Sequence, residues 1–116
     1  MLDIIEASLT INIKNMDKSI TFYESIGFDL RSRWGNHYAQ VKAGGLTIGL
    51  HPSEKAPKEK TSGNVSIGLK TDNIEKIKTE LEKLKIKFKY RQEEGGEYIH
   101  FKDPDGTELY FIKSKW

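Results

Sequence analysis

The chain has 116 residues and a formal net charge of +2, and its 19 basic and 17 acidic residues are interleaved along the sequence. This length suits one compact domain, and the interleaved charges argue against a nucleic-acid-binding surface. There is no cysteine, so disulfides and thiolate chemistry are excluded, and no apolar run reaches the roughly 20 residues of a membrane span. At the N-terminus, Asp3 and Glu6 stand where a signal peptide has basic residues, so we expect a cytoplasmic protein.

The first half of the chain predicts one helix between strands. Residues 8–13 alternate polar and apolar side chains, which is typical of a half-buried strand. Asn15 is placed to cap a helix whose apolar residues recur at helical spacing, and Gly27 is placed to end it. Three further strands are predicted from Phe28, over 38–42, and over 46–50 after the Gly44–Gly45 turn.

The second half repeats this order after a polar stretch. Residues 52–63 contain Pro52, Pro57 and charges of both signs, which favours an exposed linker. A strand over 65–70 and a helix capped by Asn73 follow. The remaining strands are predicted over 86–90, 97–102 and 107–113, with a tight turn at residues 103–106.

An internal repeat supports this division. A constant offset of 58 superposes residues 8–33 on residues 66–91 in chemical type, so that Leu9 falls on Ile67. Farther along, the offset grows by two and three, as loops of unequal length would produce. We therefore predict one domain over 1–116, built from a βαβββ module at about 5–51, a linker at 52–63 and a second module at about 64–116. The alternative, a ferredoxin-like sandwich, predicts no set of three consecutive strands after each helix.

Two segments carry a family resemblance. Residues 15–28, Asn-Met-Asp-Lys-Ser-Ile-Thr-Phe-Tyr-Glu-Ser-Ile-Gly-Phe, resemble the opening helix of the glyoxalase, bleomycin-resistance and dioxygenase superfamily, also called vicinal oxygen chelate proteins. Residues 101–109, Phe-Lys-Asp-Pro-Asp-Gly-Thr-Glu-Leu, resemble its closing hairpin. The resemblance implies an α+β fold in which two tandem βαβββ modules form a curved eight-stranded mixed-sheet funnel, with the helices outside and usually as a homodimer. Site residues in that family lie on the concave strand faces.

Strand alternation separates that concave face from the face under the helices. The residues predicted to pack under the helices are Leu9, Ile11, Ile48, Leu50, Ile67, Leu69, Ile99, Phe101, Leu109 and Phe111. The predicted concave residues are Ser8, Thr10, Asn12, Thr47, Gly49, His51, Ser66, Gly68, Tyr98, His100, Tyr110 and Ile112. From the concave set, we take as candidates for ligand binding Ser8, Thr10, Thr47, Gly49, Ser66, Tyr98, His100 and Tyr110. For Trp34 and Tyr38, two positions are equally compatible with the sequence. Both residues could lie on the concave face, or both could pack in the core or at a dimer interface.

The resemblance also gives the positions of the metal ligands in metal-dependent members. Those positions carry Ser8, Gly49, Ser66 and Tyr110. The two serines offer neutral hydroxyls, the tyrosine offers a phenol, and the glycine has no side chain. These are poor ligands for a divalent ion, so we predict no metal cofactor at the usual site. The alternative is a displaced divalent metal site that uses His51 and His100 together with Glu108 or Glu97.

Two functions follow from this face. The first is a metal-free protein that resembles the bleomycin-resistance branch and sequesters a small molecule such as an antibiotic. The sequence shows no acidic cluster for a cationic drug, so the ligand stays open. The second is a glyoxalase-like lyase or isomerase, or a dioxygenase, that uses a displaced metal or His51, His100 and Tyr110 as acid-base residues. In both cases the expected partners are a small-molecule ligand and a second copy of the chain, with no nucleic acid and no membrane.

Overall fold

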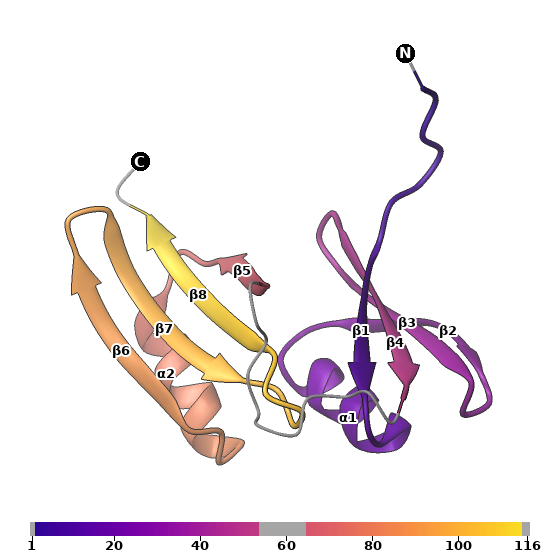
Figure 1. The fold of residues 1–116 in the computed structure, drawn as a ribbon. Helices are drawn as coiled ribbons and strands as arrows, with labels where there is room; N and C mark the ends of the chain where they lie inside the picture. Colours follow the sequence, from indigo (N-terminus) through magenta and orange to yellow (C-terminus); the bar gives the residue numbers. More distant parts are fainter. Residues whose placement is uncertain (1, 54–64, 115–116) are drawn as a thin grey trace. The chain divides into compact units, whose positions relative to one another are not determined.

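The computed structural model describes residues 2–53 and 65–114, which form two compact units, one before and one after residues 54–64. Each unit has the order β-α-β-β-β (Figure 1). The first unit consists of β1 (Leu9–Ile13), α1 (Met16–Ser25), β2 (Asp29–Trp34), β3 (Tyr38–Ala43) and β4 (Leu46–Pro52). The second consists of β5 (Ser66–Lys70), α2 (Ile74–Lys83), β6 (Phe88–Glu93), β7 (Gly96–Lys102) and β8 (Glu108–Ser114). Most of the predicted linker, residues 54–63, lies outside the described residues.

The two sheets share one topology. The strand order is β1-β4-β3-β2 in the first sheet and β5-β8-β7-β6 in the second. In each sheet the first strand runs parallel to the last, and the other neighbours are antiparallel. Three consecutive strands follow each helix, so the predicted βαβββ repeat and α+β class are confirmed, and the ferredoxin-like alternative is wrong.

The helix starts follow from the sequence. The Asn15 side chain accepts a hydrogen bond from the Lys18 N–H at 2.9 Å, and the Asn73 side chain accepts one from the Lys76 N–H at 3.0 Å. Each asparagine thereby satisfies a backbone donor that the first helical turn leaves free. The predicted caps are confirmed at both positions.

Strand β4 is two residues longer than predicted. The sequence suggested an end at Leu50 because Pro52 resembled the start of a linker. In the structure, β4 continues beside β1 until Pro52 lies opposite Ile13. A proline can occupy the end of a strand, where its missing N–H removes little of the ladder, and the next N–H, that of Ser53, donates to the Ile13 carbonyl at 3.0 Å.

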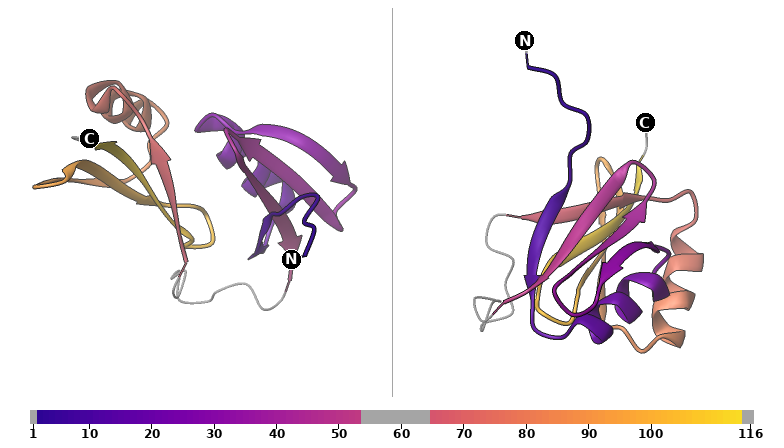
Figure 2. Two further views of the ribbon diagram at one scale, coloured as in Figure 1. Left: turned by 90° about the horizontal axis from the view of Figure 1, so that it is seen from above. Right: turned by 90° about the vertical axis from the view of Figure 1, so that its right-hand side faces the viewer.

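Each helix covers one face of its own sheet and leaves the other face open (Figures 1 and 2). Of the ten residues predicted under the helices, six are at most 4% exposed: Ile48, Leu50, Ile67, Ile99, Phe101 and Leu109. The other four are half-buried. Three of these, Leu9, Ile11 and Leu69, lie on edge strands, which have a neighbouring strand on one side only. The helix-covered face is therefore the core of each unit.

The tight turn before β8 is held by its first residue. The Asp103 side chain accepts hydrogen bonds from the N–H groups of Asp105 and Thr107, at 2.9 and 2.8 Å. The Gly106 N–H donates to the Asp103 carbonyl at 3.0 Å, and Gly106 has a φ of 90°. This left-handed backbone favours glycine. The turn sets the start of β8, and it is one of the two segments that carried the family resemblance.

Neither α1 nor α2, nor any other helix among residues 2–53 and 65–114, is long and apolar enough to cross a membrane.

Candidate functional site

The open face of the β5–β8 sheet, the face away from α2, carries the densest group of chemically useful side chains. Cross-strand register sets His100 of β7 between Lys89 of β6 and Tyr110 of β8, with Gly68 of β5 beyond Tyr110. Tyr98 belongs to the next row of the same face, because residues two apart along a strand point the same way. Both edge strands and both central strands thus contribute to one surface.

Three rings of this surface form a group that we call the aromatic platform: Tyr98, His100 and Tyr110. Their ring centroids lie 6.0 Å apart for Tyr98 and His100, 6.2 Å for Tyr98 and Tyr110, and 5.8 Å for His100 and Tyr110. The Tyr98 and His100 rings are nearly parallel, at 12°, whereas the Tyr110 ring is tilted by 46° from Tyr98 and by 37° from His100. All three are half-buried. The platform is therefore a patch of adjoining rings against which a flat molecule can pack.

Gly68 provides room for the Tyr110 ring. A Cβ atom at position 68 would lie 2.5 Å from the Tyr110 hydroxyl oxygen and 2.6 Å from Cζ. Real Cβ atoms do not approach other atoms so closely, so any side chain here would displace the ring. The glycine thus allows the hydroxyl end of the Tyr110 ring to lie over β5.

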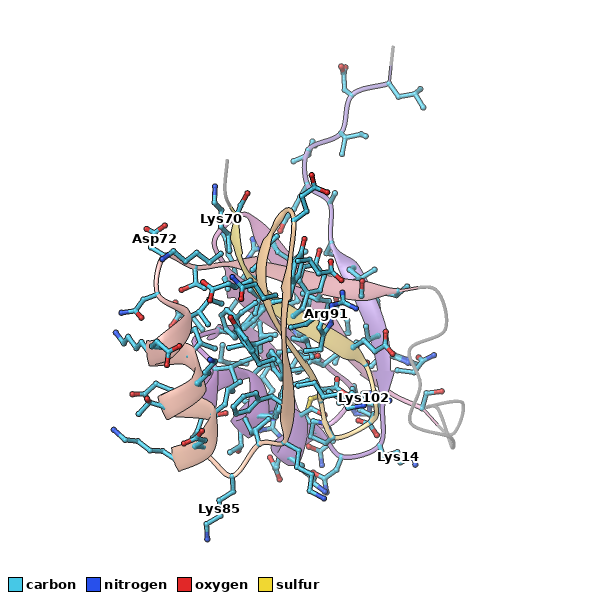
Figure 3. The ribbon with its side chains drawn as sticks, turned by 90° about the vertical axis from the view of Figure 1, so that its left-hand side faces the viewer. Lys14, Lys70, Asp72, Lys85, Arg91 and Lys102 are labelled. Atoms are coloured by element: carbon cyan, nitrogen blue, oxygen red, sulfur yellow. The ribbon has the colours of Figure 1, made fainter. Side chains whose placement is uncertain are left out.

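Charged side chains border the platform on the same open face. Arg91 holds its guanidinium carbon 5.6 Å from the Tyr98 ring centre and forms an ion pair with Glu93 at 2.8 Å. Lys102 lies across the strands from Glu108. Figure 3 shows Arg91 and Lys102 on the side of the sheet away from α2. Two cations, Arg91 and Lys102, and the carboxylates that face them thus border the rings.

His100 contains a polar atom without a partner. Its Nε2 is shielded from solvent and makes no hydrogen bond to any of the residues that the structure describes. A buried polar atom without a hydrogen bond is costly by about 1–3 kcal/mol, so such atoms commonly mark places where another group binds.

The opposite face of this sheet contains a separate polar cluster under α2. The Tyr90 hydroxyl donates to Glu97 at 2.7 Å, and the Lys78 ammonium lies 3.7 Å from the Tyr90 ring centre. The hydrogen bond to the Glu97 carboxylate raises the pKa of Tyr90. Glu97 therefore points away from His100, and the alternative that joined these two residues in one metal site is wrong.

The centre of the open face of the first sheet is filled by side chains. Thr10, Gly49 and Gln40 lie side by side across β1, β4 and β3. The Tyr38 hydroxyl lies over Gly49, where a Cβ atom would collide with it, and accepts a hydrogen bond from the Gln40 amide at 3.2 Å. Trp34 stacks on Tyr38 with 5.7 Å between ring centroids. Trp34 and Tyr38 therefore belong to the open face rather than to the core.

The structure brings some of the predicted site residues together and separates others. Tyr98, His100 and Tyr110 form one group, and Thr10 lies beside Gly49. Ser66 is exposed at the start of β5, opposite Glu108. The other three predicted residues of the first unit do not join a group: Ser8 is exposed just before β1, Thr47 is only 5% exposed, and His51 is exposed opposite Asn12.

Three neighbours of these residues were not among the predicted site residues: Gln40, Lys89 and Arg91. Alternation along β3 and β6 would have assigned them to the open faces, but their position beside Gly49, His100 and Tyr98 depends on cross-strand register.

The four family positions for metal ligands do not fit a divalent ion in this chain. Ser8 and Ser66 have neutral hydroxyls, Gly49 has no side chain, and the Tyr110 ring packs over Gly68 within the platform. Among residues 2–53 and 65–114, no three His, Asp or Glu side chains gather as a metal site would require. We therefore derive no chemistry through a metal at these positions.

The sequence and fold resemble those of known proteins. A family model, described as the Glyoxalase/Bleomycin resistance protein/Dioxygenase superfamily, matches residues 7–111. An uncharacterized protein of Mycolicibacterium smegmatis is 34% identical over 74 residues, which are 64% of this chain and 61% of that protein. The chain thus spans less than two thirds of that relative's length.

Two other proteins are similar over more of the chain. The metallothiol transferase FosB of Lysinibacillus sphaericus is 27% identical over 110 residues, covering 89% of this chain and 77% of that one. Among solved structures, a bleomycin-binding protein in complex with bleomycin superposes with a TM-score of 0.74. That superposition covers 95% of this chain and 98% of the other at 20% identity, a level that establishes the shared fold alone.

Proposed function

Because the chain belongs to the glyoxalase/bleomycin resistance protein/dioxygenase superfamily, we propose that it binds a small planar organic molecule on the aromatic platform of its second unit. The observation that carries this proposal is the grouping of Tyr98, His100 and Tyr110, with ring centroids 5.8–6.2 Å apart, on the sheet face away from α2. Adjoining rings offer a flat apolar contact, and their hydroxyl and imidazole groups orient a ligand through hydrogen bonds.

The proposed binding requires no metal ion. The donor set at the four family positions, two serines, one glycine and a packed tyrosine, supports this part of the proposal. The side chains of this chain then pack against the ring system of the ligand and form hydrogen bonds with its polar groups. Sequestration of an antibiotic is one version of such a function, and the named bleomycin complex makes an antibiotic a reasonable member of a ligand screen.

A catalytic role is the second candidate, and the unpartnered Nε2 of His100 favours it. An imidazole beside a phenol, with 5.8 Å between their ring centroids, can exchange a proton with a bound substrate. A double change, His100→Gln with Tyr110→Phe, distinguishes the two functions once a ligand is known. An enzyme would lose turnover and keep much of its affinity, whereas a binding protein has no turnover to lose.

The test of the proposal is a titration followed by side-chain NMR signals of the three platform residues. Three ligands of the same ring system are used: neutral 2-naphthol, anionic 2-naphthoate and cationic 2-naphthylmethylammonium. We expect at least one of them to shift the signals of Tyr98, His100 and Tyr110. Changing Tyr98 to Ala should then weaken binding by about 2- to 12-fold, because an aromatic pair contributes about 0.5–1.5 kcal/mol beyond its buried area.

The matched control is Tyr90→Ala, which removes a tyrosine from the opposite, helix-covered face of the same sheet. Its affinity should equal that of the unchanged protein. The proposal fails when none of the three compounds shifts the platform signals, or when Tyr98→Ala and Tyr90→Ala have the same effect.

Dimerisation and a cytoplasmic location complete the proposal. The homodimer rests on the family resemblance, and light scattering of the purified chain tests it, with a mass of one chain as the contradicting result. The cytoplasmic location stays a prediction.

A further inference from the structure

The charges around the aromatic platform indicate what kind of ligand it takes; this inference rests on the proposed function. The open face of the second sheet carries four cationic side chains and two carboxylates. The cations are Lys70, Lys89, Arg91 and Lys102, and the carboxylates are Glu93 and Glu108. Both carboxylates already face a cation, because Glu93 is paired with Arg91 at 2.8 Å and Glu108 lies opposite Lys102.

The two remaining cations stand on opposite edges of the platform. Lys89 on β6 lies directly beside His100, and Lys70 on β5 lies beside Ile112. Both side chains are exposed, and neither forms an ion pair with a described residue. Neighbouring strands are only about 4.8 Å apart, so the flexible Lys89 side chain can reach over the His100 ring and beyond its rim.

We propose that the ligand of this face is a planar aromatic carboxylate, whose ring packs on the platform and whose anionic group meets Lys89. A cationic ligand would meet an excess of positive charge here, whereas a carboxylate meets the unpaired ammonium. The Arg91 guanidinium, 5.6 Å from the Tyr98 ring centre, lies at the same β6 edge but is already paired with Glu93. His100, whose Nε2 has no partner among the described residues, lies directly opposite Lys89 in the cross-strand register.

The test compares the three naphthalene compounds by calorimetry at low and high salt. We expect 2-naphthoate to bind about two- to fivefold more tightly than 2-naphthylmethylammonium, the range for exposed charge pairs. The difference should shrink when the salt concentration is raised from about 0.05 M to about 0.5 M, because salt screens exposed charges. A cation that binds as tightly as the carboxylate, or more tightly, overturns the inference.

Three variants test whether Lys89 supplies the positive charge that the ligand carboxylate meets. Lys89→Gln should lower the affinity for 2-naphthoate by about two- to fivefold and leave the affinity for neutral 2-naphthol unchanged, since only the ion pair is lost. Lys89→Arg should keep the preference for the carboxylate. Lys76→Gln, on α2 and thus on the other side of the sheet, is the matched control and should change neither affinity. Equal behaviour of Lys89→Gln and Lys76→Gln overturns the role of Lys89, and because Lys89 is exposed, its replacement leaves folding intact.

The outcomes separate this inference from the proposed function. When 2-naphthol and both charged compounds bind the platform equally well, the proposed function stands and the inference is wrong. When none of the three binds, both are wrong.

Discussion

Gly68 on β5 and Gly49 on β4 shape the open faces of their two sheets in the same way. Each lies under a tyrosine: Tyr110 covers Gly68 in the second unit, and the Tyr38 hydroxyl covers Gly49 in the first. A missing side chain on one strand therefore decides where the ring of a neighbouring strand lies. In the second unit this glycine helps to place a platform residue.

Replacing Gly68 by Ala should impair binding more than folding. The new Cβ would displace the Tyr110 ring, which is half-buried and can move, so we expect a loss of about 1 kcal/mol or less in the free energy of unfolding. Ligand affinity should fall by about tenfold, equivalent to ~1.4 kcal/mol, because the platform loses its geometry. Chemical denaturation and calorimetry measure the two effects.

The control is Gly45→Ala, where a Cβ would meet nothing within 4 Å. It should leave affinity unchanged and raise the free energy of unfolding by about 0.4–1 kcal/mol, because alanine lowers the entropy of the unfolded chain. A Gly68→Ala protein that binds as well as Gly45→Ala would contradict the role assigned to the Tyr110 position.

For single residues, the sequence predicts correctly which face of the sheet a side chain lies on, because alternation along the strand alone decides it. Tyr98, His100 and Tyr110 were predicted on one face, and the register brings them together there. Alternation did not predict that Thr47 would be only 5% exposed, because burial depends on what covers a residue as well as on the direction in which it points. The roles of these residues as ligand contacts remain predictions.

At the scale of elements, the two helices begin alike and end differently. Both start at an asparagine cap, and both are followed by a residue with positive φ at the repeat offset of 58. In the first unit that residue is Gly27, at a φ of 109°, whereas in the second it is Lys85, at 59°. A non-glycine residue in this region is strained, because its Cβ crowds the backbone.

Lys85→Gly should therefore stabilise the protein, against the usual effect of an added glycine. Relief of the left-handed strain exceeds the entropy that glycine adds to the unfolded chain, so we expect a gain of up to about 1 kcal/mol in the free energy of unfolding. Gly27→Ala, the reverse change at the equivalent position, should lower it by about 1 kcal/mol or more. Urea denaturation of both variants checks the signs, and a loss of stability in Lys85→Gly would contradict the argument.

At the scale of the whole molecule, the repeat in the sequence became two units of identical topology with different open faces. In the first unit, a tyrosine hydroxyl and a glutamine amide fill the centre of the face, whereas in the second three rings adjoin one another. The duplicated scaffold thus presents two chemically distinct surfaces. The family's metal positions in this chain, Ser8, Gly49, Ser66 and Tyr110, belong to both units.

Divalent metal ions should not stabilise this protein. A ligand present at 100 times its dissociation constant raises the free energy of unfolding by about 2.7 kcal/mol, which would appear as a melting-temperature shift of several degrees. We expect no such shift with nickel, zinc, manganese or iron, compared with protein in a chelator, because the four positions lack ligands. Stoichiometric metal in protein purified without a histidine tag, together with a clear shift, would contradict this and direct attention to His51 and His100.

The sequence by itself determined the order of elements, the helix caps, the closing turn and the face on which each strand residue points. These features depend on neighbours a few residues away, through alternation, helical spacing and side-chain caps. Only the tertiary structure decided that Lys89 lies beside His100, that Tyr110 lies over Gly68 and that β4 continues to Pro52. Such contacts join strands distant in the chain, and their register is set by backbone hydrogen bonds and packing that no single strand encodes.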